Sequence, residues 1–359
     1  MKSVNIPSHI LKPGMTTFED LFNSMGVLVL SRDVTLDQSQ IDKILLNNIE
    51  RVRIRLAEST NLYGLDEDGE IRSVYDQEKI KDFREKYTTE VKEVTSIIKE
   101  IGKGASVDVY SVCEISKRIV AEFKAAKEII NYLQFVRDLD DDTYSHSLNV
   151  CLLSVIIAKW LDLKAEEIDE IAAAGLLHDI GKTRVSEKLL RKPGKLTPEE
   201  FEEIKKHTVI GYMMMDGIKD VTGNMRYTVL MHHEKIDGSG YPMGALDEEI
   251  PLFPKIVAVA DIYDAMTSNR TYRKRMCPFE VIKNFEMQTF GKLDTKVLTT
   301  FLSRIANSYV SDYVELNTGE VCEIVFINPN RIWQPIVRSG EEFIDLSQDL
   351  DKRYIKSIV

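Results

Sequence analysis

The sequence predicts a mainly α-helical protein, with a small mixed α/β domain at its N-terminal end and a small β-rich appendage at its C-terminal end. Three observations predict this class. Apolar residues recur at three- and four-residue spacing from residue 76 to about residue 139, and further helical patterns follow as far as residue 308. Residues 52–56 instead alternate between apolar and polar, as in a half-buried strand, and the tail from residue 309 is strand-rich in composition.

The chain is expected to divide into four segments. They are a small accessory domain, a helical connector, the main helical domain and the appendage, over residues 1–75, 76–135, 136–308 and 309–359. Within the first segment, residues 13–15 predict a turn, 26–30 a strand and 39–48 a short amphipathic helix. The connector is open to four interpretations: plain packing, a solvated connector, an interdomain lever, or part of a homodimer interface.

Composition and charge limit the classes of partner. With 359 residues, 43% of them hydrophobic and 29% charged, the chain is long enough for two or three domains and a substantial core. The net charge of −11 argues against a nucleic-acid polymer, because that binding needs a positive surface that releases counterions. A small phosphorylated substrate remains compatible, since metal ions or a local cationic pocket can supply the charge.

The cysteines and the apolar stretches indicate the compartment. The four cysteines are scattered without a C-x-x-C pair, as is typical of thiols in a reducing cytosol. The first residues lack the order of a signal peptide. The longest apolar stretch, residues 150–161, is interrupted by Ser154 and Lys159 and is too short to span a bilayer. We therefore expect a cytoplasmic protein without a membrane partner.

Histidines crowd into one part of the sequence. The chain has six, and five fall between residues 146 and 233: His146, His178, His207, His232 and His233. Each lies near a predicted helix, so a fold that gathers these helices would build a polynuclear metal site inside a helical bundle. A nitrogen and oxygen ligand set without cysteine is more typical of a site for iron, manganese or zinc than of a structural zinc finger.

His178 and Asp179 stand side by side at the end of an alanine-rich helical run, residues 166–174. If the helix continues, His178 shares a face with Lys182, four residues on. Alone, such a pair is more often a core histidine held by a carboxylate, and it is the company of the other histidines that favours a functional site. Asp142 precedes His146 by four residues, so it is either a metal ligand on the same face or a residue at the helix start.

The next helices carry the remaining candidates. Thr197 and Pro198 begin a helix with a capping box, and we expect this helix to carry His207. The adjacent His232 and His233 at the end of another helix would point about 100° apart, which suits one helix serving two metals. The cationic residues between 184 and 195 are either a solvated face or a rim that attracts phosphate.

An apolar helix opened by Pro254 bears two acidic residues three apart, Asp261 and Asp264, and such buried carboxylates require cations. Together with the preceding motifs they resemble the HD-GYP family, a branch of the HD-domain phosphohydrolases, over about residues 136–308. The matching strings are H-D-x-G-K at 178–182, H-H-E-x-x-D-G-x-G-Y-P at 232–242, D-x-x-D-A at 261–265 and R-x-Y-R at 270–273. Lys255 and residues 183–186 depart from the family's usual pattern without removing a ligand.

The resemblance implies an all-helical, metal-dependent phosphohydrolase domain. It implies a phosphodiesterase that hydrolyses the bacterial second messenger cyclic di-GMP to pGpG or GMP, by in-line attack of a hydroxide that bridges two or three divalent metals, commonly iron or manganese. The implied ligands are His146, His178, Asp179, His207, His232, His233 and Asp261, with Asp142 at the position of a third-metal carboxylate. The implied catalytic residues are Asp179 and Lys182, and the implied substrate contacts are Lys182, Asp264, Arg270 and Arg273.

Two alternatives of other classes stay open. The domain is either a cyclic-dinucleotide sensor or scaffold with weak turnover, although no ligand is missing from the set, or a phosphohydrolase of another nucleotide. The Gly240-Tyr241-Pro242 loop either braces His232 and His233 or docks a partner such as a diguanylate cyclase domain.

Overall fold

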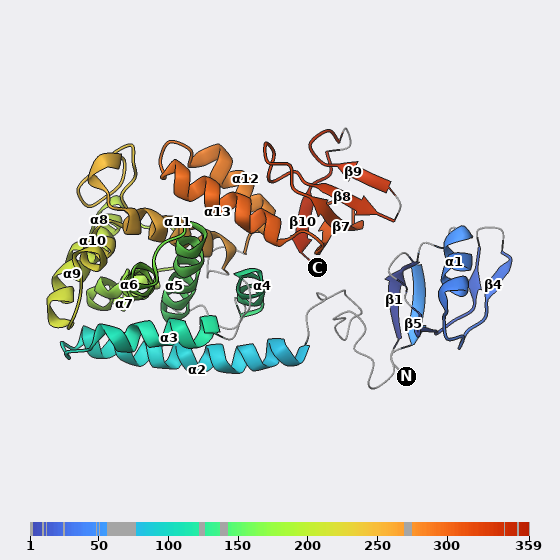
Figure 1. The fold of residues 1–359 in the computed structure, drawn as a ribbon, viewed down its shortest axis with the longest axis horizontal. Coiled ribbons are helices and arrows are strands. Elements are labelled where there is room, and N and C mark those ends of the chain that lie inside the picture. Colours follow the sequence, from blue (N-terminus) through green and yellow to red (C-terminus); the bar gives the residue numbers. More distant parts are fainter. Residues whose placement is uncertain are drawn as a thin grey trace.

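A computed structural model describes most of the chain. The described residues are 3–8, 11, 13–23, 26–47, 49, 51–55, 77–121, 126–136, 143–268, 275–340, 342–349 and 352–358. The arrangement of helices and sheets is shown in Figure 1. Among the described residues, no helix combines the length and the apolar character that crossing a bilayer requires.

The N-terminal segment is a small mixed α/β unit. Its strands form one sheet in the order β1-β5-β2 and a separate hairpin of β3 with β4. The elements are β1 (Ser3–Pro7), β2 (Thr16–Thr17), β3 (Leu21–Phe22), β4 (Leu28–Leu30), α1 (Gln38–Leu46) and β5 (Arg51–Arg55). Helix α1 begins at a reciprocal capping box, in which Asp37 and Gln40 each bond the other's backbone N–H. The expected strand and helix are present within a residue or two of their predicted bounds.

Helices make up the middle of the chain. They are α2 (Gln77–Gly102), α3 (Val109–Ala121), α4 (Ala126–Val136), α5 (Thr143–Trp160), α6 (Ala165–Leu177), η2 (Ile180–Arg184), α7 (Glu187–Leu190), α8 (Pro198–Lys205), α9 (His207–Met214), η3 (Met215–Gly217), α10 (Gly223–Met231), η4 (Asp247–Glu249), α11 (Leu252–Thr267), α12 (Pro278–Gln288) and α13 (Thr295–Ser308). The three η elements are short 3₁₀ helices.

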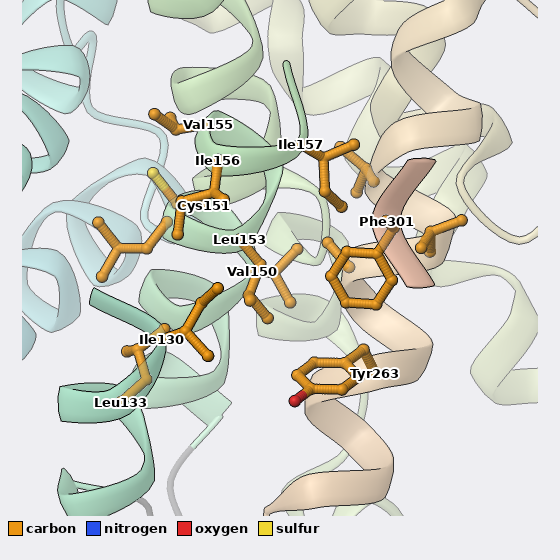
Figure 2. Close-up of a cluster of buried hydrophobic side chains, with 14 of the residues drawn as sticks. Ile130, Leu133, Val150, Cys151, Leu153, Val155, Ile156, Ile157, Tyr263 and Phe301 are labelled. Carbon is orange, nitrogen blue, oxygen red and sulfur yellow. The ribbon is translucent and has the colours of Figure 1, made fainter. Parts of the chain in front are cut away.

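Helix α5 lies at the centre of this bundle. It is apolar on all sides, and a helix with that pattern must be covered all round. Val150, Cys151 and Leu153 are buried on different faces, and α5 packs against α6 and α11. Figure 2 shows these side chains beside Tyr263 and Phe301 from α11 and α13. The core therefore fixes α5, α6 and α11, which carry part of the histidine and aspartate set.

The C-terminal segment is β-rich, as predicted. Its five antiparallel strands have the order β10-β6-β7-β8-β9. They are β6 (Tyr313–Leu316), β7 (Val321–Phe326), β8 (Ile336–Ser339), β9 (Glu342–Asp345) and β10 (Ile355–Ile358). Inward residues such as Val314, Cys322 and Ile324 join the same buried cluster as the helices. The mainly helical class with small sheets at both ends is confirmed, whereas the exact limits of the four segments remain predictions.

One condition of the helix predictions is not met, and one helix prediction is wrong. Helix α6 ends at Leu177, and the chain continues into η2, so His178 and Lys182 do not share one continuous α-helix. The helix opened by Thr197 stops at Lys205, and His207 instead begins α9. In both places the sequence period continues through the break, because the residues on either side of it face the same core.

Candidate metal centre

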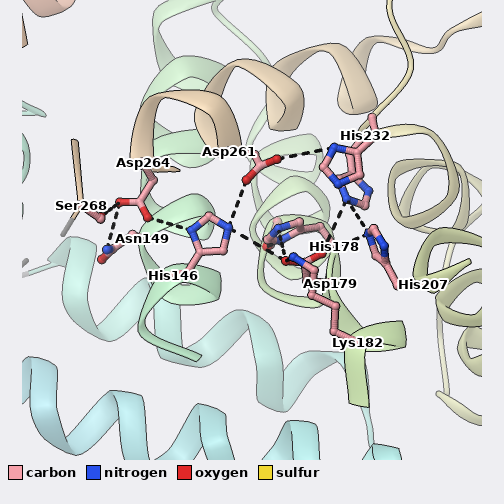
Figure 3. A network of polar contacts seen from close by, with 12 residues as sticks. His146, Asn149, His178, Asp179, Lys182, His207, His232, Asp261, Asp264 and Ser268 are labelled. Atoms are coloured by element: carbon pink, nitrogen blue, oxygen red, sulfur yellow. Dashed lines mark hydrogen bonds and ion pairs between the residues drawn. The ribbon is translucent and has the colours of Figure 1, made fainter. Parts of the chain in front are cut away.

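The predicted metal ligands that the structure describes come together at one site from five places in the bundle (Figure 3). His146 comes from α5, His178 and Asp179 follow α6, and His207 begins α9. His232 and His233 follow α10, and Asp261 lies on α11. Two groups offer ligand atoms that all lie within 4.8 Å of one another: Asp179, His207, His232 and His233, and His146, His178 and Asp179. Asp179 belongs to both groups, so its carboxylate joins them.

A glycine allows two of these segments to meet. A Cβ added to Gly181 would lie 1.9 Å from the carbonyl oxygen of His207 and 2.6 Å from the backbone nitrogen of Gly211. Any side chain here would push α9 away from η2. The glycine of the H-D-x-G-K string therefore brings His207 within reach of Asp179.

The histidine rings are held by hydrogen bonds at Nδ1. His178 Nδ1 lies 2.7 Å from the carbonyl oxygen of Gly175, and His207 Nδ1 lies 2.7 Å from that of Ile204. His232 Nδ1 lies 3.0 Å from the carbonyl oxygen of Val229. A carbonyl oxygen only accepts, so Nδ1 carries the proton in each ring and Nε2 offers a lone pair to the site. This is the arrangement of metal-ligating histidines.

Asp179 lies at the middle of the cluster. Its Oδ1 is 3.2 Å from His207 Nε2, and its Oδ2 is 3.2 Å from His178 Nε2. Burial opposes its ionisation, yet the positive charge of Lys182 and the contact with His178 hold the pKa of Asp179 well below its usual range. Asp179 Oδ1 and His178 Nε2 are buried without a hydrogen-bond partner among the described residues. One of these atoms faces each ligand group, and divalent cations bound there would satisfy both atoms.

Asp261 and Asp264 lie on either side of His146. Asp261 Oδ1 is 3.0 Å from His146 Nε2, on the side of the cluster, and its Oδ2 is 3.7 Å from His233 Nδ1. Asp264 Oδ2 is 2.8 Å from His146 Nδ1, on the opposite side of the ring. Burial lowers the pKa of His146, but hydrogen bonds to the two carboxylates outweigh it and raise that pKa to about 9. The ring thus lies between two negative groups, which favour a positive charge on it.

Asp264 does not lie where a substrate would meet it. Its side chain is fully buried and receives hydrogen bonds from Asn149 and Ser268 as well as facing His146. The resemblance to the HD-GYP family implies a substrate contact for Asp264, whereas the structure places this residue behind His146. Neither Asn149 nor its neighbour Tyr87 is a sequence-predicted site residue. Asn149 follows His146 by three residues on an apolar helix, and that spacing is the one signal that could have indicated it.

The loop after His233 packs back onto the site. Glu234 is buried and accepts three backbone N–H groups, from Met243, Gly244 and Ala245, at 2.6, 3.2 and 3.0 Å. The Tyr241 ring lies 4.7 Å from the His233 ring, centroid to centroid. Burial lowers the pKa of His233 to about 3, so this imidazole is neutral and suited to coordination. The geometry favours the interpretation of this loop as a brace for His233.

Three predicted residues cannot be placed. Asp142, Arg270 and Arg273 lie outside the described residues. Lys182 is described: its side chain is 24% exposed, and its Nζ lies against Asp179 Oδ2. Of the cationic residues that follow it, Arg191 and Lys192 form ion pairs with Glu187 and Glu200, which fits a solvated face.

Residues 135–297, which carry the histidine-aspartate cluster, match the family model described as "HD domain". The H-H-E-x-x-D-G-x-G-Y-P string inside this match is the one that resembles the HD-GYP family.

Three relatives are named as phosphodiesterases of cyclic dinucleotides. The chain is 34% identical over 228 residues to "Cyclic di-GMP phosphodiesterase PA4108" of Pseudomonas aeruginosa, covering 64% of this chain and 55% of that protein. It is 39% identical over 176 residues to "Cyclic di-GMP phosphodiesterase" of Thermotoga maritima, covering 49% and 47%. It is also 33% identical over 192 residues to "3'3'-cGAMP-specific phosphodiesterase 1" of Vibrio cholerae, covering 50% and 40%. The chain thus spans about half the length of the curated relatives it matches.

Proposed function

We propose that this protein is a metal-dependent phosphodiesterase that hydrolyses cyclic di-GMP to pGpG, to GMP, or to both. The observation that carries the proposal is the convergence of histidine Nε2 atoms on the two oxygens of Asp179, with each Nδ1 proton already committed elsewhere. Such a donor set binds two divalent cations, of which iron and manganese suit mixed nitrogen and oxygen ligands. The names of the relatives support a cyclic dinucleotide as the substrate class.

The ligands divide into two groups around Asp179. His207, His232 and His233 would hold one cation and His146 and His178 the other, with Asp261 completing the set. When bound, the cations supply charge stabilisation to the phosphodiester and lower the pKa of water. Asp142 would contribute to a third site, and Arg270 and Arg273 to binding of phosphate or guanine.

Lys182 has the electrostatic role in this proposal. Its ammonium lies against Asp179 Oδ2 and is partly open to solvent. A compact, fixed positive charge at this place stabilises negative charge on phosphoryl oxygens as it develops. Asp264 acts as a positioning residue that orients His146, rather than as a substrate contact.

A second candidate substrate has its own support. Relatives from Vibrio cholerae are named as 3'3'-cGAMP-specific phosphodiesterases and are 32–33% identical to this chain over the aligned residues. The two dinucleotides share the cyclic phosphodiester and differ in one base. The metal cluster would act on the phosphodiester that both dinucleotides share. Selectivity between the two substrates would therefore depend on the residues that contact the bases.

The test begins with anaerobic purification and measurement of bound iron and manganese. The same sample is then incubated with cyclic di-GMP and, separately, with 3'3'-cGAMP, and the products are separated by chromatography. We expect two or three metal equivalents and conversion of cyclic di-GMP. Asp169→Asn serves as a matched control for Asp179→Asn, because Asp169 lies on the surface of α6 in an ion pair with Lys117.

Three outcomes contradict parts of the proposal. Protein that binds no metal would remove the metal centre. Metal-loaded protein that binds the dinucleotide without cleaving it would favour a sensor. Metal-loaded protein that cleaves only 3'3'-cGAMP would replace the substrate.

A further inference from the structure

Helix α2 reaches the metal centre through one buried hydroxyl. Tyr87, at 3% exposure, donates a hydrogen bond from its hydroxyl to Asn149 Oδ1 at 2.7 Å. From this contact we infer that Tyr87 is a positioning residue of the metal centre, acting on His146 through Asn149 and Asp264. The inference rests on the proposed metal-dependent function.

The contacts form an unbroken chain between the helices. Asn149 Nδ2 donates to Asp264 Oδ1 at 3.0 Å, and Asp264 Oδ2 lies 2.8 Å from His146 Nδ1. The links from Asn149 to His146 are visible in Figure 3. His146 then presents Nε2 to Asp261 and to Asp179, at 3.0 and 4.0 Å. A chain of four side chains thus joins α2, through α5 and α11, to the ligand cluster.

Each link fixes the orientation of the next group. An asparagine amide can be turned over, which exchanges its oxygen and its nitrogen. The Tyr87 hydroxyl donates to the oxygen, and therefore the nitrogen faces Asp264. Without that donor, Asn149 Oδ1 would lose this partner inside a site where unsatisfied polar groups are costly, and the contact with Asp264 would have to hold the amide. The amide would then be held less firmly as a donor to Asp264, and Asp264 less firmly against His146.

The C-terminal end of α2 contacts η2, the segment that carries Lys182. A Cβ on Gly102, the last residue of the helix, would lie 3.1 Å from Cβ of Thr183. Thr183 follows Lys182 in η2 and bonds back to the carbonyl oxygen of Ile180 at 2.8 Å. One helix therefore touches the segment that carries Lys182 as well as the chain behind His146. This is more than the plain packing that the helical pattern of α2 predicts.

The test compares two tyrosine hydroxyls. Tyr87→Phe removes the donor and keeps the ring, which packs 5.8 Å from Phe83. Tyr309→Phe is the matched control. Tyr309 is also buried, its hydroxyl accepts a hydrogen bond from Gln134 Nε2 at 2.9 Å, and its ring packs against Phe279. Binding of Mn²⁺ to metal-stripped protein is measured by titration, with thermal unfolding as the check on folding.

Removal of a group that holds a metal-ligating histidine typically lowers the metal affinity by roughly 10- to 100-fold. Because Tyr87 acts through two intervening side chains, we expect Tyr87→Phe to weaken Mn²⁺ binding by about 3- to 10-fold, whereas Tyr309→Phe leaves it unchanged. Asn149→Leu should weaken binding more, and adding Tyr87→Phe to it should have little further effect, as expected for residues in one chain of contacts.

The outcomes separate this inference from the proposed function. Wild-type protein that binds no Mn²⁺ would overturn both. Wild-type protein that binds Mn²⁺, with equal affinities in Tyr87→Phe and Tyr309→Phe, would overturn the role of Tyr87 alone. Full additivity of the Tyr87 and Asn149 substitutions would also overturn it, since independent sites do not form a chain.

Discussion

Gly181 and His207 approach so closely that a single added carbon atom would lie 1.9 Å from the His207 carbonyl oxygen. The contact is between backbones, so no side-chain rotation relieves it. It places the start of α9 against η2 and thereby sets the distance from His207 to Asp179. A change at Gly181 would therefore affect metal binding as well as the stability of the fold.

Gly181→Ala should displace α9 and weaken Mn²⁺ binding by at least 10-fold. Overpacking at a rigid contact costs on the order of 1–3 kcal/mol, so the melting temperature should also fall. Gly217→Ala is the control, because a Cβ there meets nothing within 4 Å and the backbone is not left-handed. Calorimetric titration and thermal unfolding of both variants provide the measurements. Equal behaviour of the two would show that the close approach does not set the site.

Lys182→Ala should keep the metals and lose most of the turnover. Removal of one preorganised group that stabilises transition-state charge typically lowers kcat by about 10²- to 10³-fold. Lys188→Ala is the control, since Lys188 is an exposed cation six residues further on. Metal content and steady-state hydrolysis are measured on the same samples. Unchanged kcat in the Lys182 variant would remove its proposed role.

Asp264→Asn keeps the shape of the side chain and removes the charge behind His146. We expect Mn²⁺ affinity to fall by roughly 10- to 100-fold, because the ring loses the carboxylate that holds its Nδ1 proton. Asp294→Asn is the control, as Asp294 caps α13 by accepting the backbone N–H of Val297. If Asp264 instead contacted the substrate, KM would rise while metal affinity stayed constant. Titration and kinetics together distinguish the two roles.

Tyr241 allows the two interpretations of its loop to be separated. Tyr241→Phe keeps the ring against His233 and should retain metal affinity, whereas Tyr241→Ala removes the packing and should weaken it several-fold. Mn²⁺ titration of both variants is the measurement. A loop that only docks a partner would leave the metal affinity of both variants at the wild-type value.

The sequence by itself determined the fold class and the identity of the clustered residues. The helical period from residue 76 onward and the strand-rich tail reflect local burial, and the structure confirms both. The crowding of five histidines between residues 146 and 233 predicted that imidazoles and carboxylates would converge on one pocket. The resemblance of the strings around His178, His232 and Asp261 to the HD-GYP family implied which side chains these would be.

Only the tertiary structure decided how these residues are held. The end of α6 before His178, the place of Asp264 behind His146 and the reach of Tyr87 into the site depend on contacts between distant segments. Tyr87 and Asn149 are 62 residues apart, and Asn149 and Asp264 are 115 apart. A periodic pattern reports which face of a helix is covered, but it carries no record of which distant side chain covers it. Packing of α2, α5 and α11 around one core supplied that pairing.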